Sequence, residues 1–281
     1  MKIFRLLILA VSLLFVGSCD DIEEPFIEAT GKCGDASLPI PIKQILVEEF
    51  TGHQCGNCPR ADEQIELLKE LYCDHVIPVS IHAGFFAETN TSGMYSYDYR
   101  TEEGDDLDLY FGASAAGLPN AIINRSDDGQ TYSLAQWTGV IVDLLEEEPI
   151  IDININTSYT NSSRDLDIDI DVIFINAVNE NLRLSLYFIE DSIKTWQKDY
   201  EAEPSEDIEI YTHNHVLRGV VNGTWGEEIL NGPINANDVV SKSYGYDVNE
   251  EWIIENSSIV AFVYKNDTKE VLQASQVHIM P

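Results

Sequence analysis

The spacing of apolar residues changes at Pro149, and this change constrains the fold more than any other feature of the sequence. After Pro149, apolar and polar residues alternate in short runs that are separated by turn residues. Such alternation is typical of half-buried strands in packed sheets. The alternating runs are residues 151–157, 165–172, 182–188, 259–264 and 271–279. We therefore predict an all-β sandwich, immunoglobulin-like in architecture, over residues 150–281.

Before Pro149, segments with the spacing of strands alternate with segments that have the spacing of helices. Strands are predicted at residues 44–50, 76–82 and 121–124, and helices at residues 57–71, 109–116 and 133–145. Chains that alternate in this way build α/β sheets. We therefore predict an α/β domain over residues 38–149, which contains a polar insert at residues 84–108.

The first 18 residues have the pattern of an export signal. Lys2 and Arg5 are basic, and the apolar run at residues 6–16 is shorter than the roughly 20 residues that span a bilayer. Gly17 and Ser18 then precede Cys19, and small residues before a cysteine at this place resemble the bacterial lipobox. The resemblance implies a lipoprotein signal peptide at residues 1–18, followed by a tether at residues 19–37 that begins with lipidated, for example palmitoylated, Cys19. Several acyl chains hold a protein firmly at a membrane.

The remaining four of the five cysteines form two pairs. Cys55 and Cys58 make a Cys-x-x-Cys motif. Cys33 and Cys73 are left, and in the oxidising cell envelope we expect them to form a structural disulfide. The alternative is that Cys33 and Cys73 are two unrelated thiols.

The Cys-x-x-Cys motif lies where the first predicted strand ends and the first predicted helix begins. At such a place, the free N–H groups and the dipole of the helix stabilise a thiolate. Cys55 is therefore the expected nucleophile, and Cys58, one turn further on, is the expected resolving thiol in thiol–disulfide exchange. His53 precedes Cys55 by two residues, and a charged imidazole there would lower the pKa of the Cys55 thiol.

This segment resembles the thioredoxin superfamily, in which strand, loop, Cys-x-x-Cys motif and helix follow in the same order. The resemblance implies that Glu49, six residues before Cys55, is a buried acid that moves a proton for the resolving cysteine. It also implies that Pro119, in Gly-Leu-Pro before a predicted strand, is a cis-proline that faces the disulfide and holds the substrate backbone. The implied fold of residues 38–149 is thioredoxin-like, with Cys55, Cys58, Glu49 and Pro119 as the catalytic set.

A second resemblance covers nearly the whole chain. Several blocks look like the outer-membrane lipoprotein family of Bacteroidetes that is named for a twenty-eight-kilodalton protein. These blocks are the lipobox and residues 48–59, 81–84, 117–119, 124–125, 212–218 and 223–226. The resemblance implies attachment to the outer membrane of the cell envelope, on either the periplasmic or the surface face.

The charge of the chain limits its partners. Its formal net charge is −33, from 16 Lys+Arg against 49 Asp+Glu. A surface this acidic repels phosphate backbones, so we expect no nucleic-acid partner. The expected partners are envelope proteins that carry thiols or disulfides, together with the membrane through the lipid anchor. No motif predicts a cofactor.

Three functions remain open for the cysteine pair. The first is thiol–disulfide exchange or redox-coupled protein binding, which would make the chain an oxidoreductase. The second is a copper or zinc site in which His53 and His82 join the two cysteines. The third is a non-enzymatic surface or adhesion lipoprotein whose Cys-x-x-Cys disulfide is structural.

Two histidines in the second half allow two interpretations. His213 and His215 are two residues apart, so on a strand they would share one face and form a metal-binding pair. In the alternative, which we favour because no third ligand is evident, they belong to a polar cluster in which Arg218 pairs with a carboxylate.

Overall fold

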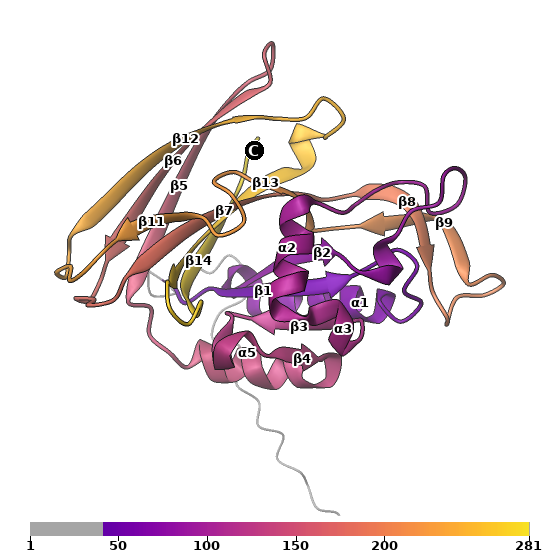
Figure 1. Ribbon diagram of the computed structural model, residues 1–281, viewed down its shortest axis with the longest axis horizontal. Helices are drawn as coiled ribbons and strands as arrows, with labels where there is room; N and C mark the ends of the chain where they lie inside the picture. The colour runs from indigo at the N-terminus through magenta and orange to yellow at the C-terminus, as the bar shows by residue number, and fades with distance from the viewer. Residues whose placement is uncertain (1–41, 281) are drawn as a thin grey trace, which may run out of the picture.

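The structure of the protein, a computed structural model, describes residues 42–280. It is a mixed α/β structure in which sheet predominates (Figure 1). The largest sheet has nine strands in the order β14-β13-β7-β10-β2-β1-β3-β4, with β11 paired to β7, while β12-β6-β5 form a second sheet and β8-β9 a hairpin. The strands are β1 (Ile45–Thr51), β2 (Val76–His82), β3 (Asn120–Ile123), β4 (Thr131–Ser133), β5 (Ile151–Thr160), β6 (Asp165–Phe174), β7 (Leu182–Glu190), β8 (Ile193–Lys198), β9 (Asp207–His213), β10 (Val216–Val220), β11 (Glu227–Leu230), β12 (Val239–Asp247), β13 (Ser257–Lys265) and β14 (Val271–His278). The α-helices are α1 (Pro59–Tyr72), α2 (Glu102–Phe111), α3 (Ala113–Ala116), α4 (Ser126–Gly129) and α5 (Trp137–Leu145).

The regular patterns in the sequence correspond to elements of the structure. The five alternating runs are β5, β6, β7, β13 and β14, and the strands predicted in the first half are β1, β2 and β3. The alternation did not predict β8 to β12. Of these, β10 has only five residues, and the others bury almost no apolar side chains.

The helix predicted at residues 109–116 is instead two helices, α2 and α3. α2 begins within the predicted polar insert, where the Thr101 side chain accepts a hydrogen bond from the N–H of Gly104 and caps the helix. α2 ends at Gly112, whose φ of 69° lies in the left-handed region that glycine adopts readily. The chain therefore turns at Gly112 before α3 begins.

The nine-stranded sheet joins the two halves of the chain. β10, from the second half, lies beside β2, where Val216 pairs in parallel with Ser80. The Ser80 N–H donates to the carbonyl oxygen of His215 at 2.7 Å, and β7 pairs with the other edge of β10. The predicted division at residue 149 falls between α5 and β5, but main-chain hydrogen bonds cross from one half to the other.

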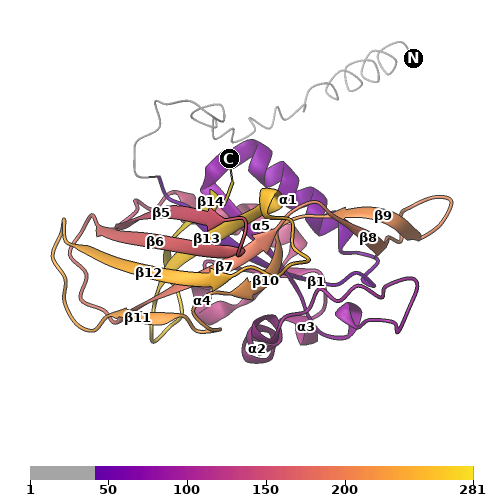
Figure 2. The ribbon, with the colours of Figure 1, turned by 90° about the horizontal axis from the view of Figure 1, so that it is seen from above.

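The two faces of the large sheet are covered by different elements. On one face, β1 and β3 pack against α1 and α5, whereas β7 and β13 pack against the small sheet β12-β6-β5 (Figure 2). On the opposite face, one continuous core runs from β1 through β2 and β10 to β7 and β13, and α2 and α3 contribute to it. Because neighbouring residues of a strand point to opposite faces, Glu48 and Glu49 of β1 enter different cores.

A buried ion pair also joins the two halves. Arg125 donates to both carboxylate oxygens of Glu48, at 2.8 and 2.7 Å, and to the Tyr187 hydroxyl at 2.8 Å. Arg125 follows β3, Glu48 lies on β1 and Tyr187 lies on β7. The Arg125 guanidinium thus links β1, in the N-terminal half, to β7, in the C-terminal half, by hydrogen bonds.

The predictions for the N-terminus fall on residues that the structure does not describe. These are the signal peptide at residues 1–18, the tether at residues 19–37 and lipidation of Cys19. Within residues 42–280, no helix has both the length and the apolar character that are needed to cross a membrane.

Candidate functional site

The Cys-x-x-Cys motif forms a disulfide at the start of α1. Cys55 and Cys58 are bonded, and their Cα atoms lie 5.4 Å apart. α1 begins at Pro59, where the missing N–H of proline is harmless, and Cys58 is the N-cap. Cys58, rather than Cys55 as predicted, is therefore the cysteine that lies directly at the N-terminus of the helix.

The disulfide is covered by the hairpin formed by β8 and β9, which comes from the second half of the chain. Only 3% of Cys55 and 1% of Cys58 is exposed to solvent. The hairpin extends past the first turn of α1 (Figure 2). A reagent in solution therefore reaches the sulfur atoms only if this cover moves.

Three hydrogen bonds to main-chain carbonyl groups hold the hairpin on the motif. Gln197 Nε2 donates to Cys55 O at 3.0 Å, Lys198 N to His53 O at 2.8 Å, and Tyr200 N to Gly56 O at 2.9 Å. The Tyr200 ring lies so close to Gly56 that a Cβ at Gly56 would be 2.5 Å from it. Gly56 is thus required for the close approach of the hairpin.

The insert after β2 packs against the residues that precede Cys55. The N–H of Gln54 donates to Phe86 O at 3.0 Å, and His53 Nε2 lies 3.0 Å from Glu88 O. A Cβ at Gly52 would lie 2.5 Å from the main chain of Phe86. The loop before the disulfide is therefore held between the insert and the hairpin.

Glu49 is fully buried on the face of β1 that α1 covers. One carboxylate oxygen accepts a hydrogen bond from the Ser80 hydroxyl at 2.9 Å, and the other has no hydrogen-bond partner among the described residues. Burial, followed by the negative charge of Asp62, raises the pKa of Glu49 well above its usual value. Glu49 therefore holds its proton to a higher pH than an ordinary glutamate and can donate it to a neighbouring group.

Pro119 lies beside the loop that leads to Cys55. The Leu118–Pro119 peptide bond is cis. β3 pairs antiparallel with β1, so that Asn120 lies opposite Phe50. Pro119, one residue earlier, is therefore next to Thr51, four residues before Cys55. Its predicted role in holding a substrate backbone stays a prediction.

Three buried histidines surround the ring of Tyr99. The ring centroids of His82, His213 and His53 lie 4.3, 4.8 and 5.8 Å from the centroid of Tyr99. Burial lowers the pKa of all three histidines, that of His82 well below its usual value and that of His213 to about 3. The lowered pKa of His53 favours its neutral form at neutral pH, so the condition of a charged imidazole beside Cys55 gains no support here.

His213 and His215 lie in different surroundings. His213 belongs to the aromatic cluster around Tyr99, whereas His215 Nδ1 lies 3.0 Å from Asp191 Oδ1 and its Nε2 lies 3.3 Å from Glu66 Oε1. Burial opposes protonation of His215, but its hydrogen bonds to Asp191 and Glu66 prevail and raise its pKa. The two imidazoles therefore do not form the metal-binding pair.

Arg218 pairs with a carboxylate, as the alternative interpretation predicted. Its Nε lies 3.3 Å from Glu190 Oε2, and both side chains are almost fully buried. Within residues 42–280, no group of three or more histidine, cysteine, aspartate or glutamate side chains is placed to hold a metal ion. This finding leaves the copper or zinc interpretation without structural support in the described part of the chain.

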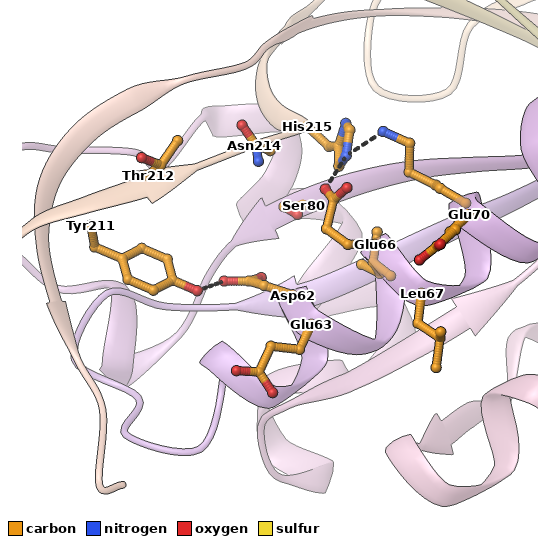
Figure 3. Close-up of a pocket in the computed structure, with 12 residues that line it drawn as sticks. Asp62, Glu63, Glu66, Leu67, Glu70, Ser80, Tyr211, Thr212, Asn214 and His215 are labelled. Atoms are coloured by element: carbon orange, nitrogen blue, oxygen red, sulfur yellow. Dashed lines mark hydrogen bonds and ion pairs between the residues drawn. The ribbon is translucent and has the colours of Figure 1, made fainter. Parts of the chain in front are cut away.

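A groove of about 820 Å³ opens between α1 and β9, and its wall on α1 begins at Asp62 (Figure 3). Asp62, one helical turn after Cys58, lines the groove and accepts a hydrogen bond from the Tyr211 hydroxyl at 2.6 Å. Ser80, the partner of Glu49, also lines it. Burial raises the pKa of Asp62 to about 6.

The second predicted cysteine pair is only partly described. Cys73 follows α1 and is disulfide-bonded. Cys33 lies outside the described residues, so its bond with Cys73 stays a prediction.

The family of the protein follows from its second half. The family model described as outer membrane protein Omp28 matches residues 105–281, which is more than half of the chain. The chain belongs to the Omp28 family. Membership places this Omp28 protein at the outer membrane of the cell envelope, as the sequence predicted. The Cys-x-x-Cys motif lies before the residues that the family model matches. A search of curated proteins finds no match to the chain.

Solved structures share the fold of this Omp28 protein. HBP35 of Porphyromonas gingivalis has a TM-score of 0.64 and 15% identity, over 85% of this chain and 76% of that chain. AGR_C_4864 from Agrobacterium tumefaciens has a TM-score of 0.51 and 15% identity, over 85% of this chain and 95% of that chain. A domain of the outer membrane lipoprotein Omp28 from P. gingivalis is 28% identical over 48% of this chain and 92% of that one, at a TM-score of 0.34. The first two show that the arrangement of strands and helices occurs in other proteins.

Several residues around the disulfide were not predicted from the sequence. The sequence could have predicted Asp62, because a carboxylate four residues after Cys58 lies one helical turn away on the same face of the helix. Gln197 and Tyr200 have no such signal, since they contact the motif from more than 140 positions further along the chain. Only the tertiary fold reveals that they cover the site.

Proposed function

We propose that this outer-membrane protein carries out thiol–disulfide exchange, or redox-coupled binding of proteins, through Cys55 and Cys58. The observation that carries the proposal is a disulfide at the N-terminus of α1, on the face of the sheet where a buried carboxyl, Glu49, retains its proton. We further propose that residues 38–149 are thioredoxin-like and that residues 150–281 form an immunoglobulin-like sandwich.

Each residue of the catalytic set has a role in this proposal. A partner thiolate attacks Cys55, the more exposed cysteine of the pair, and Cys58 leaves as a thiolate at the N-terminus of α1. Glu49 supplies the proton that neutralises it. Pro119, beside the loop that carries Cys55, holds the backbone of the partner. The reaction uses no cofactor.

The proposed partners are envelope proteins that carry thiols or disulfides, and no nucleic acid. The hairpin must move before such a partner reaches Cys55, because it bonds directly to residues 53, 55 and 56. A partner that displaces Tyr200 and Gln197 would react, whereas a small thiol would react slowly. Lipidated Cys19 would keep the reaction at the membrane.

The reduction potential of the Cys55–Cys58 pair tests the proposal. We expect reversible reduction at a potential between about −270 and −120 mV, the range of thiol–disulfide oxidoreductases. The Cys58→Ser variant should then accumulate mixed disulfides with envelope proteins, because Cys55 can attack but no thiol resolves the product. The Cys55→Ser/Cys58→Ser double variant is the matched control and should trap nothing.

The burial of the disulfide favours a second candidate, a non-enzymatic surface or adhesion protein in which the bond is structural. In that case the potential should lie below about −300 mV. Removal of the bond by the Cys55→Ser/Cys58→Ser variant should also destabilise the fold by about 2–4 kcal/mol. A denaturant titration of the variant against the wild type measures this difference.

A further inference from the structure

Reduction of the buried disulfide requires a route for protons. Cys58 is 1% exposed, and the hairpin covers the motif. When the disulfide breaks, Cys58 becomes a thiolate, and a buried charge without a partner is strongly unfavourable. The proton that neutralises it has to arrive through the protein.

The groove between α1 and β9 brings water close to Glu49. Ser80 lines the groove and donates its hydroxyl hydrogen to Glu49 Oε2 at 2.9 Å. Asp62 also lines it, one turn after Cys58 on α1, and is held by the Tyr211 hydroxyl at 2.6 Å (Figure 3). Glu49 is therefore one hydrogen bond away from the wall of the groove.

The charges of Glu49 and Asp62 influence each other. The charge of Asp62 is the largest electrostatic contribution, after burial, to the raised pKa of Glu49. Burial raises the pKa of Asp62 to about 6, so Asp62 exchanges protons with water near neutral pH. The other groups that act on Asp62 are Tyr211 and His215 from the opposite wall of the groove and Glu63 and Glu66 from α1.

We propose that Asp62 passes protons between the water in the groove and Glu49 during thiol–disulfide exchange. This inference rests on the proposed function and extends it. Asp62 acts through Glu49 and does not meet the sulfur atoms, so it is a positioning residue. The groove thus serves as the proton entrance.

The steps balance for a partner that is a protein dithiol. One partner thiol loses its proton to water, attacks Cys55 Sγ and forms a mixed disulfide, while Cys58 leaves with the electron pair of the broken bond. Glu49 gives its proton to Cys58 and regains one from water through Asp62. The second partner thiol loses its proton, attacks the partner sulfur and releases Cys55 as a thiolate, which takes up a proton from water. The partner is oxidised to a disulfide, and the Cys55–Cys58 pair is reduced.

The test compares the full-length protein with the Asp62→Asn variant, with dithiothreitol as the reductant. The reduction rate of the Cys55–Cys58 disulfide is measured across the neutral pH range, and the protonation of Glu49 is followed by the infrared band of its carboxyl group. In Asp62→Asn we expect the rate at neutral pH to fall about a hundredfold, the low end of the effect of a proton-transfer group. The pKa of Glu49 should fall, because a negative charge that raised it is gone.

Two further variants separate the proton route from a loss of structure. Glu63→Gln removes the next carboxylate along α1, which lines the same groove but is exposed. Its charge is the last of the causes that raise the pKa of Asp62, so the variant should keep the wild-type maximum rate, with only a small shift of the pH profile to lower pH. Tyr211→Phe keeps Asp62 and removes its hydrogen bond, which lowers the pKa of Asp62 in the wild type. The pH dependence of the rate in Tyr211→Phe should therefore shift to higher pH.

The outcomes distinguish this inference from the proposed function. If Asp62→Asn and Tyr211→Phe both keep the wild-type pH profile and the pKa of Glu49 does not move, the inference is wrong and the proposed function stands. If the reduction potential of the wild-type pair at equilibrium lies below about −300 mV, the proposed function is wrong and the inference with it.

Discussion

Two neighbouring carboxyl groups on β1 have opposite surroundings. Glu48 points into the core that α2 and α3 cover, where Arg125 and Tyr187 bond to it. Glu49 points toward α1, accepts a hydrogen bond from Ser80 and has one oxygen without a hydrogen-bond partner in the described structure. The sequence marks Glu49 by its distance from Cys55, but nothing in it shows that Glu48 pairs with a residue 77 positions away.

Removal of the Arg125 guanidinium should destabilise the fold strongly. The Arg125→Ala variant leaves the Glu48 carboxylate buried without its partner, and we expect a loss of about 3–5 kcal/mol in the free energy of unfolding. Urea titration followed by circular dichroism measures it. The matched control is Arg60→Ala, since Arg60 forms an exposed ion pair with Glu201 at 2.8 Å and should change stability by about 1 kcal/mol or less. Equal losses in the two variants would contradict the role of the buried pair.

The protonation of Glu49 should make the fold less stable as the pH rises. Above the usual glutamate pKa of 4.5, the unfolded chain has released this proton while the folded protein still holds it. The free energy of unfolding therefore falls with pH until the raised pKa of folded Glu49 is reached, by about 1.4 kcal/mol for each pH unit. Glu49→Gln should remove this slope and be more stable than the wild type at neutral pH. Parallel pH profiles for wild type and variant would show that Glu49 ionises normally in the fold.

At the scale of elements, the sequence predicts the site only where its parts are adjacent in the chain. The strand β1, the motif and α1 follow one another, so their spacing and the N-terminal proline predict their geometry. Residues 193–213 contribute strands that bury almost no apolar side chains. They contact the motif through two main-chain N–H groups, the Gln197 amide and the Tyr200 ring. Such contacts, made from a distant part of the chain, leave no periodic pattern in the sequence, and the cover over the disulfide was therefore not predicted.

A methyl group at Gly56 should open this cover. In Gly56→Ala, the new Cβ would lie 2.5 Å from the Tyr200 ring, so the hairpin has to shift. A loss of about 1.4 kcal/mol in the free energy of closure would expose the disulfide about ten times more often. We expect dithiothreitol to reduce it faster by this factor. The matched control is Gly139→Ala on α5, where no atom lies within 4 Å of the added Cβ and the reduction rate should stay unchanged. An unchanged rate in Gly56→Ala would mean that the hairpin does not limit access.

At the scale of the whole molecule, the change of spacing at Pro149 predicted two units, whereas the hydrogen bonds form one large sheet. The runs of apolar residues identified β5, β6, β7, β13 and β14. β6 buries one face, whereas β7 and β13 are buried on both faces. The runs gave no information on which strand lies beside which. The two halves of the chain are joined in this sheet by β10, whose five residues are too few to show an alternation of apolar and polar residues. β10 pairs with β2 through one residue pair, Val216 and Ser80.

The continuous sheet should unfold as one unit. The cores of β1 and β13 are contiguous on the face that α2 and α3 cover, and Arg125 links β1 to β7. We expect the slowest-exchanging amide hydrogens of β1 and β13 to exchange with the same free energy of opening, within about 1 kcal/mol. Native-state hydrogen exchange at increasing denaturant measures both strands at once. Two separate opening energies, divided near residue 149, would show that the halves unfold independently.

The hairpin that covers Cys55 is the last part of the site to be synthesised. Gln197 follows Cys55 by 142 residues, and a bacterial ribosome needs roughly ten seconds to add so many. During that interval both thiols are open to any oxidant or misplaced cysteine that the emerging chain encounters. A bond made then requires no opening of the hairpin. We therefore expect the pair to be oxidised faster before the C-terminal half has folded than after it.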